Sequence, residues 1–439
     1  MGQSFSHPLV QTYGIAALRH LLNSPESALE ARFGEDQTAL SPEAETALGL
    51  LQQVESALPG DPDDAFFRPI ERLRRLSRYH EETGTTIADA IRQSAGGSKQ
   101  AFNGTDELEC SLIELAWHAY PLLTLQDTHS RQHLPVHVVN WESPVRHRFE
   151  TALFADPDLR PLFAEKEEHG DHLGFAYTST GSGGTTQVFG FADRILSSSW
   201  KLAHFRNEVP TEEQFLAAAR ELFGTLRSAM RGEQATVPVR VGLAGVLPPD
   251  GMTTSDWGWA RIRPVDSRDK RFSQRTPFGD GDHSLQHSGP DGQDVQIRYS
   301  GDLVVEIDLP YRIKAGKTPG EGNMPSNPLS EWRTIEETID NVRLALLLTG
   351  KADNITAVPT WRTFVDPLSH PDNMGWNDPR NAPRLRPTQL DQQQIKEWGE
   401  WAARIAATRT KGIGIAIRRI LRAVAERRQA EDVLVDAII

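Results

Sequence analysis

Charged side chains near the end of the sequence are the residues best suited to bind or process a phosphate. Arg418, Arg419 and Arg422 fall within one predicted helix. A mixed group follows, made of Arg427, Arg428, Glu431, Asp432 and Asp436. Guanidinium groups bind phosphate oxygens through paired hydrogen bonds, so the five arginines predict a local basic face that could bind RNA.

The helix that carries these arginines has an apolar stripe with a charged interruption. Its apolar residues recur at helical spacing and predict a face that packs on a core; they are Ile413, Ile417, Ile420, Leu421 and Val424. The same spacing continued falls on Arg427, Arg428 and Glu431 before apolar residues return at Leu434. Two interpretations remain open. The charged group is either a solvated turn or a partly buried polar cluster in a helical bundle, where buried charges must be paired.

Histidine spacing raises the question of a metal site. The histidines that lie four residues apart are His129, His133 and His137 in one segment and His283 and His287 in another. On a helix this spacing places imidazoles on one face, as zinc requires. Pro135 interrupts the first set, the second falls in a predicted loop, and no cysteine accompanies either. The sequence therefore predicts no metal site and no cofactor.

Two further groups are explained more simply by structure than by binding. Segment Thr180–Thr186 is rich in glycine, but it lacks the lysine of a P-loop and precedes a strand, which favours a hairpin turn. Two tryptophan pairs have the spacing of one strand face and one helix face, Trp257 with Trp259 and Trp398 with Trp401. Packing in a core or interface is the preferred interpretation of both pairs, over stacking on RNA bases.

Length and composition limit the class of protein. The chain has 439 residues, 38% of them hydrophobic and 24% charged, which predicts a globular protein with more than one domain. The net charge of −13 argues against wrapping of nucleic acid around the whole surface. The single cysteine, Cys110, excludes an internal disulfide and fits a reducing compartment. No apolar run is long enough for a membrane span and no secretory signal is present, so a cytoplasmic location is predicted.

Periodicity predicts an α+β fold in three regions. Residues 1–128 read as a helical region. Residues 129–329 read as a mainly antiparallel β domain, interrupted by one helix that opens at Thr211. Segments 266–293 and 314–327 are poor in apolar residues and are predicted to be exposed loops. Residues 330–439 read as helices, separated by a loop over residues 356–387.

The C-terminal helical segment, residues 415–439, resembles the opening of an ApeA-like HEPN domain. Such domains show an arginine, a short spacer, and then Asp-x-Leu-(Ile/Val)-Asp before an Ile-Ala-Leu-Glu stretch, and the residues from Arg427 to Ile439 match the first part. Four upstream segments also resemble, in order and spacing, the part that precedes such domains: 241–247, 256–263, 303–307 and 339–348. The resemblance covers about residues 235–439, and the first 130 residues match no family that we recognise.

The resemblance implies a prokaryotic anti-phage defence protein of the abortive-infection type. HEPN proteins of this kind are endoribonucleases that cut RNA without metal through an Arg-x4-6-His element, usually assembled across a homodimer. Here the dimer would form through the C-terminal helices, RNA would be the substrate, and a phage-derived trigger would activate the protein. Arg75 and His80 have the spacing of such an element, but they lie in the unmatched region, where a charged helix face is preferred. No catalytic residue is assigned.

Two alternatives to the nuclease remain. The last helix reaches Ile439 without a residue that closes helices, which predicts that the reading frame continues into helices that carry the missing element. The first alternative is a non-catalytic sensing or binding module that docks through its C-terminal helices onto a partner chain. The second, an enzyme for small molecules in the β-rich middle, lacks a convergent catalytic motif.

Overall fold

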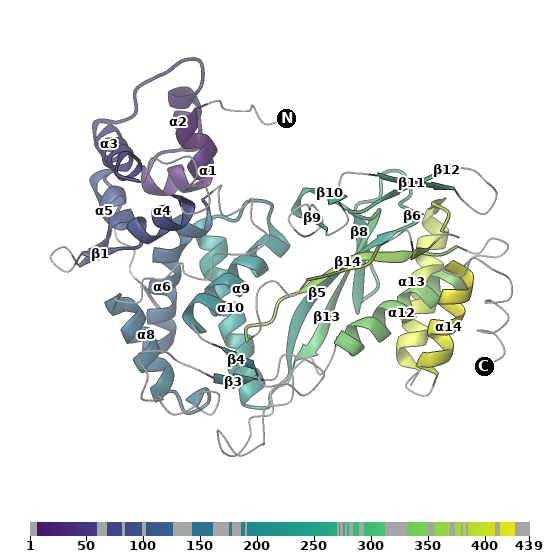
Figure 1. Ribbon diagram of the computed structural model, residues 1–439. Coiled ribbons are helices and arrows are strands. Elements are labelled where there is room, and N and C mark those ends of the chain that lie inside the picture. The colour runs from purple at the N-terminus through teal and green to yellow at the C-terminus, as the bar shows by residue number, and fades with distance from the viewer. Residues whose placement is uncertain are drawn as a thin grey trace.

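The computed structural model describes most of the chain. The described ranges are 7–58, 68–80, 84–98, 102–125, 143–160, 175–177, 186–188, 191–269, 272, 275–276, 279–280, 284–288, 294–311, 332–349, 355–368, 374–378, 381–382, 385–408 and 413–425. Helices gather on one side of a central sheet, and three further helices lie on the other side (Figure 1).

Helices make up the N-terminal part of the molecule, with two short strands between them. The elements are α1 (Pro8–Leu21), α2 (Glu26–Phe33), α3 (Pro42–Ser56), α4 (Arg68–Leu76), β1 (Tyr79–His80), β2 (Thr85–Thr86), α5 (Ile87–Ser94), α6 (Glu107–Leu123) and α8 (Pro144–Ala155). Helix α6 is buried along nearly its whole length and contacts α1, α5, α8, α9 and α10. It is therefore the central helix on which the others of this region pack.

Two long helices connect this region to the sheet. A short hairpin, β3 (Phe175–Tyr177) with β4 (Thr186–Val188), precedes α9 (Phe191–Arg206) and α10 (Glu212–Met230). Helix α10 begins after Thr211, as predicted, and its start is a capping box in which Thr211 and Gln214 each satisfy a backbone N–H of the other. Its apolar stripe is buried, as Phe215, Leu222 and Leu226 illustrate.

Helices α8 and α9 correct the expectation of a single helix between residues 129 and 329. Helix α9 is not predicted from the sequence because Ser197, Ser198 and Ser199 lie in its middle and interrupt the helical spacing of apolar residues, although all three are buried. Serine is tolerated there when its hydroxyl bonds to backbone carbonyls. Ser199 Oγ donates to Ile195 O at 2.5 Å, and Ser198 Oγ donates to Asp366 O at 3.0 Å.

A six-stranded antiparallel sheet forms the centre of the molecule. Its order is β15-β14-β5-β13-β8-β7. The strands are β5 (Ala235–Ala244), β7 (Ser255–Asp256), β8 (Ala260–Pro264), β13 (Leu303–Tyr311), β14 (Val358–Phe364) and β15 (Met374–Trp376). Short peripheral strands are β6 (Val246–Leu247), β9 (Arg275–Thr276), β10 (Gly279–Asp280), β11 (Ser284–Ser288), β12 (Asp294–Arg298) and β16 (Thr388–Gln389). Strands β5 and β13, which overlap segments 241–247 and 303–307 of the sequence analysis, are neighbours in this sheet.

Strands β14 and β15 lie where only a loop was predicted. β14 pairs with the central strand β5, with Thr363 opposite Arg240, and the register shifts between Pro359 and Trp361. Proline has no backbone N–H to donate to a neighbouring strand, and within a sheet it usually marks a bulge or an edge strand. Because Pro359 lies inside β14, the sequence pattern does not indicate a strand there. The predicted exposed loop at 266–293 also needs correction, because it contains β9, β10, β11 and the fully buried Asp269.

Three helices form the C-terminal part of the described chain, α12 (Trp332–Thr349), α13 (Gln392–Ala407) and α14 (Gly414–Ala425). α12 contacts both of the others. Trp398 of α13 is fully buried and donates through Nε1 to Val342 O of α12 at 2.8 Å. Gly399 lets the Trp257 ring lie against α13, since a Cβ there would fall 2.5 Å from Trp257 Cδ1.

The tryptophan pairs pack within the protein, as predicted. Trp257 and Trp398 lie edge to face with ring centroids 5.2 Å apart, and Trp259 and Trp401 pack against the main core. Trp257 and Trp259 do not occupy one strand face, however. They belong to the turn between β7 and β8, where Gly258 takes a φ of 82° that favours glycine.

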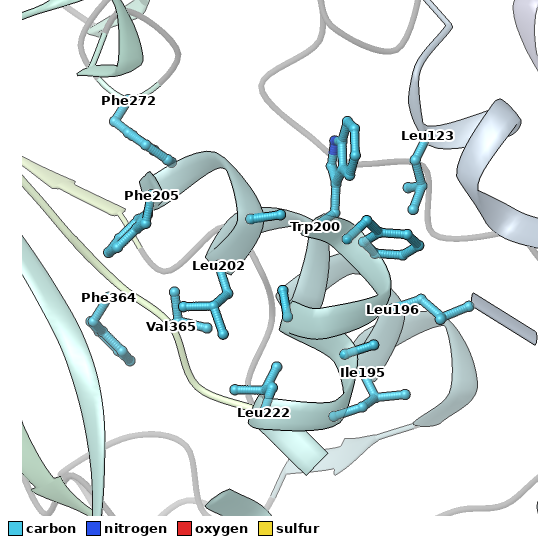
Figure 2. Packing of buried hydrophobic residues seen from close by; sticks show 14 of the residues in the cluster. Leu123, Ile195, Leu196, Trp200, Leu202, Phe205, Leu222, Phe272, Phe364 and Val365 are labelled. Carbon is cyan, nitrogen blue, oxygen red and sulfur yellow. The ribbon is translucent and has the colours of Figure 1, made fainter. Parts of the chain in front are cut away.

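One hydrophobic core runs from the N-terminal helices through α9 and the sheet to α12 and α13. Figure 2 shows α9 in the middle of this core, with Leu196 and Trp200 on the side of Leu123 from α6, and Leu202 on the side of Val365 after β14. Within the described residues no helix is long and apolar enough to cross a membrane. The α+β fold class is confirmed.

A buried ion network joins the sheet to the helical side. Arg240 on β5 and Arg263 on β8 both bind Glu306 on β13, at 2.8 and 3.0 Å. Asp269, in a short turn of 3-10 helix at Ser267–Asp269, accepts from Arg263 Nη1 at 2.6 Å and Nη2 at 2.8 Å. Arg240 also donates to the carbonyl of Phe205 at the end of α9. The network therefore fixes the sheet against that helix.

Candidate docking surface

Helix α14 is anchored to α12 through a narrow apolar face. Ile417 and Leu421 are buried there, one helical turn apart, and Ala425 continues the face. Beside them, Arg418 Nε lies 3.8 Å from Asp340 Oδ2, and Asp340 also receives Arg343 Nη1 at 3.3 Å. Burial of Asp340 raises the pKa of its carboxyl above the ordinary value, although both arginines oppose this shift.

The other side of α14 exposes aliphatic side chains to solvent. Ile413, Ile415 and Ile420 have relative exposures of 53%, 68% and 46%. Large exposed aliphatic residues are uncommon in the described part of this chain; the others are Ile70, Val209 and Leu348. Three of them lie within eight residues on α14, Ile413 and Ile420 two turns apart on one face and Ile415 on another. Exposed aliphatic side chains of this kind can mark an interaction site. We call Ile413, Ile415 and Ile420 with Arg418, Arg419 and Arg422 the α14 surface.

Basic groups lie beside Ile415. Arg418, Arg419 and Arg422 follow Ile415 by three, four and seven residues, so they lie on the same side of the helix as Ile415. The Arg418 side chain is 44% exposed, and Arg422 is also exposed. Within the described residues Arg419 Nη1 has no hydrogen-bond partner. From 413 to 425 the chain carries three arginines and no acid, but Asp340 of α12 lies 3.8 Å from Arg418, and Arg422 is also engaged.

The structure thus divides the predicted site residues into two groups. Arg418, Arg419 and Arg422 come together on α14, as the helical spacing predicts. Arg427, Arg428, Glu431, Asp432 and Asp436 lie outside the described residues, so the question of a solvated turn or a buried cluster stays open. The predicted apolar stripe needs correction, because Ile413 and Ile420 face solvent while Ile417 and Leu421 face α12.

The other sequence candidates do not converge on a site. Arg75 on α4 pairs with Glu71 at 3.1 Å, which fits the charged helix face, and His80 belongs to strand β1. His287 lies on β11 opposite Val295, and the other spaced histidines lie outside the described residues. No group of three or more metal-binding side chains occurs in the part of the chain that the structure describes. The antiparallel pairing of β3 with β4 confirms the predicted hairpin there, although its turn is outside that part.

A histidine cluster around Trp117 was not predicted from the sequence. His118 on α6 lies with Nδ1 2.5 Å from Asp89 Oδ2 on α5 and with Nε2 3.9 Å from Glu114 Oε1. The Trp117 ring also contacts His20, whose Nδ1 lies 2.9 Å from Glu212 Oε2. Asp89 and His118 are 29 residues apart, and no local sequence motif predicts their contact. The cluster joins α1, α5, α6 and α10.

The two histidines of this cluster have opposite pKa shifts. Burial would lower the pKa of His118, but the nearby Asp89 and Glu114 carboxylates raise it above its ordinary value. Burial lowers the pKa of His20, and the Glu212 carboxylate only partly offsets this. A raised folded-state pKa stabilises the fold below the unfolded pKa of about 6.5 and loses that effect as pH rises through the folded pKa. A lowered folded-state pKa, as for His20, stabilises the fold above the unfolded pKa, and this contribution is lost as pH falls through the folded pKa.

Substituting each histidine should therefore change stability with opposite pH dependence. The stability lost in His118→Gln should be largest near pH 6 and shrink at higher pH, by at most about 1.4 kcal/mol per pH unit. The stability lost in His20→Gln should be smallest below pH 6 and grow as pH rises toward 7. Urea unfolding followed by tryptophan fluorescence from pH 5 to 9 measures both. Losses independent of pH, or of the same trend for both variants, would contradict the assignment.

No known family model, no curated protein and no solved structure matches this chain.

Proposed function

We propose that this chain is a sensing and docking module that associates with a partner through its C-terminal helices. The observation that carries the proposal is the exposed cluster of Ile413, Ile415 and Ile420 on α14. Covering such side chains removes apolar area from water, which is the main favourable term in protein association. The N-terminal helices, which share one core with the sheet, supply a large rigid body for sensing.

Size-exclusion chromatography of extracts from cells that produce the protein tests this function. Wild-type protein should elute as a complex larger than the monomer. The triple variant Ile413→Ser, Ile415→Ser and Ile420→Ser should elute as the monomer. The matched control is Ile70→Ser with Val209→Ser, which removes exposed aliphatic residues elsewhere and should leave the complex intact. Elution of wild type as the monomer would contradict the proposal.

A second candidate is the HEPN ribonuclease of anti-phage defence. It is favoured because four segments that carry the resemblance pack together: β5, the β7–β8 hairpin and β13 belong to one sheet, and α13 bridges Trp257 of that hairpin to α12. Arg418, Arg419 and Arg422 would then contact RNA, and the C-terminal helices would form a homodimer. A phage-derived trigger and a cytoplasmic location belong to this candidate as well.

Incubation with single-stranded RNA in excess EDTA tests the nuclease. The protein should cleave RNA without metal and leave 2′,3′-cyclic phosphate ends, because the 2′-OH is the attacking group. The variant Arg75→Ala should cleave at the wild-type rate, since Arg75 is engaged with Glu71. Intact RNA after long incubation with saturating protein would count against this candidate.

A further inference from the structure

Two histidine–carboxylate pairs cross the contact between the N-terminal helices and the helices that follow them. His20 on α1 lies 2.9 Å from Glu212 on α10, and His118 on α6 lies 2.5 Å from Asp89 on α5. Both histidine side chains are nearly buried, with exposures of 3% and 11%. Histidine changes its charge near neutral pH, so protonation alters the charge enclosed by this contact.

Two arginines supply permanent positive charge around these histidines. Arg92 on α5 donates from Nη1 to His20 O at 2.6 Å. Arg148 on α8 binds the Glu114 carboxylate at 2.5 Å, and the other oxygen of Glu114 lies 3.9 Å from His118 Nε2. The two pairs and the two arginines therefore form one connected group of charges around Trp117, which we call the Trp117 junction.

The charges of the Trp117 junction balance in one protonation state of its histidines. Its other charged groups are three carboxylates and two guanidinium groups, from Asp89, Glu114, Glu212, Arg92 and Arg148. A protonated His118 with a neutral His20 therefore makes positive and negative charge equal. A proton on His20 leaves one positive charge in excess, and loss of the His118 proton leaves one negative charge in excess. Neighbouring ion pairs are neutral in themselves and do not alter this balance: Arg146 with Glu150 and Arg19 with Glu26.

The surroundings of each histidine favour this balanced state near the ordinary histidine pKa of about 6.5. Burial lowers the pKa of His20, so His20 stays neutral there. Burial acts in the same direction on His118, but the Asp89 and Glu114 carboxylates outweigh it and raise the pKa, so His118 stays protonated. Tyr120, whose ring centroid lies 5.3 Å from that of His20, stays neutral because burial raises its pKa to about 12.

The packing of the helices favours opening at this junction over unfolding of the whole chain. Helix α6 packs more extensively against α8 and α10 than against α1 or α5. An uncompensated buried charge destabilises the contact that encloses it, and local opening returns that charge to water. Helices α1 and α5 are therefore the elements that should separate from α6 first when the charges no longer balance.

We propose that the Trp117 junction is a pH-sensitive switch, which holds α1 and α5 against α6 and α10 near pH 6.5 and releases them when the pH moves in either direction. Protonation of buried histidines is a known way to change a contact between packed elements. Release would expose the face of α6 that carries Trp117. The switch belongs to the N-terminal helices and does not depend on the docking function proposed for α14.

Hydrogen–deuterium exchange of the full chain from pH 5 to 8.5, corrected for the intrinsic exchange rate at each pH, tests the switch. Peptides that cover α1 and α5 should exchange most slowly near pH 6.5. On either side their exchange should accelerate by up to about tenfold per pH unit, until the histidine that titrates there has changed its charge. Peptides that cover α13 should lack this minimum. Exchange of α1 and α5 that parallels exchange of α13 at every pH would overturn the proposal.

Substitutions separate the roles of the two histidines. His20→Gln should abolish the acceleration below pH 6.5 and keep the one above it. His118→Gln leaves the carboxylates of Asp89 and Glu114 in excess, so α1 and α5 should exchange fast at neutral pH, with no further acceleration above it. Glu114→Gln combined with His118→Gln restores equal charge and should return slow exchange above pH 6.5.

A histidine outside the junction provides the control. His147 on α8 is exposed, and His147→Gln should leave the exchange profile of the wild type unchanged. Circular dichroism checks that the variants fold, and if His118→Gln does not, the profiles of the wild type and of His20→Gln still decide. The charge-balance mechanism would be wrong if His20→Gln kept the acceleration below pH 6.5. It would also be wrong if the double variant exchanged as fast as His118→Gln.

Discussion

Replacing Asp269 with alanine should lower the free energy of unfolding by about 3–5 kcal/mol, the usual effect of removing one partner from a buried ion pair. Asp269 is fully buried and accepts two hydrogen bonds from Arg263, and Arg240 Nη1 lies 3.5 Å away. Without the carboxylate of Asp269, the partly buried Glu306 is the acid still shared by Arg240 and Arg263. Urea unfolding at pH 7 measures the change.

An exposed ion pair on α9 and α10 is the matched control for Asp269. Arg206 binds Glu221 through two contacts of 2.5 and 2.6 Å, but both side chains are about half exposed, at 52% and 46%. Solvent screens this pair, so Glu221→Ala should cost less than about 1 kcal/mol. A loss for Asp269→Ala as small as that for Glu221→Ala would show that the network does not hold the sheet to α9.

Gly242→Ala should cost about 3 kcal/mol, although it adds a single methyl group. Gly242 lies in the central strand β5, opposite Val304, and an added Cβ would fall 2.1 Å from Trp361 Nε1. Trp361 is almost fully buried and donates from Nε1 to Ser300 O at 2.8 Å. The ring would have to move and lose this hydrogen bond, or the strands would have to separate.

Gly224→Ala on α10 is the control for Gly242→Ala. An added Cβ at position 224 meets no atom within 4 Å, and the residue is helical. Alanine favours the helix over glycine by up to about 1 kcal/mol, so this variant should be slightly more stable than wild type. Thermal or urea unfolding of both variants gives the comparison. Equal effects on stability would contradict the close approach of Trp361 to β5.

The parts of the fold that the sequence predicts are those with strong local signals. The helix opening at Thr211 has a capping box and a regular apolar stripe, and strands β5 and β13 have β-branched runs between turn residues. Helix α9 lacks such a signal because buried serines replace part of its apolar face. β14 lacks it because Pro359 lies inside the strand. In both cases tertiary burial, which no short window of sequence records, decides the structure.

The candidate site could be predicted only in part for the same reason. Helical spacing is enough to bring Arg418, Arg419 and Arg422 onto one helix. It is not enough to orient α14, because isoleucine or leucine occurs on several sides of the helix and packing on α12 decides which ones are buried. The exposure of Ile413 and Ile420 is therefore a result of tertiary structure. The contact between Asp89 and His118 likewise needs α5 and α6 to pack together.

Site-specific photo-crosslinking tests the docking function most directly. A photo-reactive phenylalanine at position 415 places the crosslinker in the α14 surface, and the same group at position 70 places it at another exposed isoleucine, on α4; the two residues are 68% and 44% exposed. After irradiation of cells that produce the protein, position 415 should give one discrete adduct with a second polypeptide, and position 70 should give none. Absence of an adduct at position 415, or the same diffuse pattern at both positions, would contradict the claim that α14 is a docking surface.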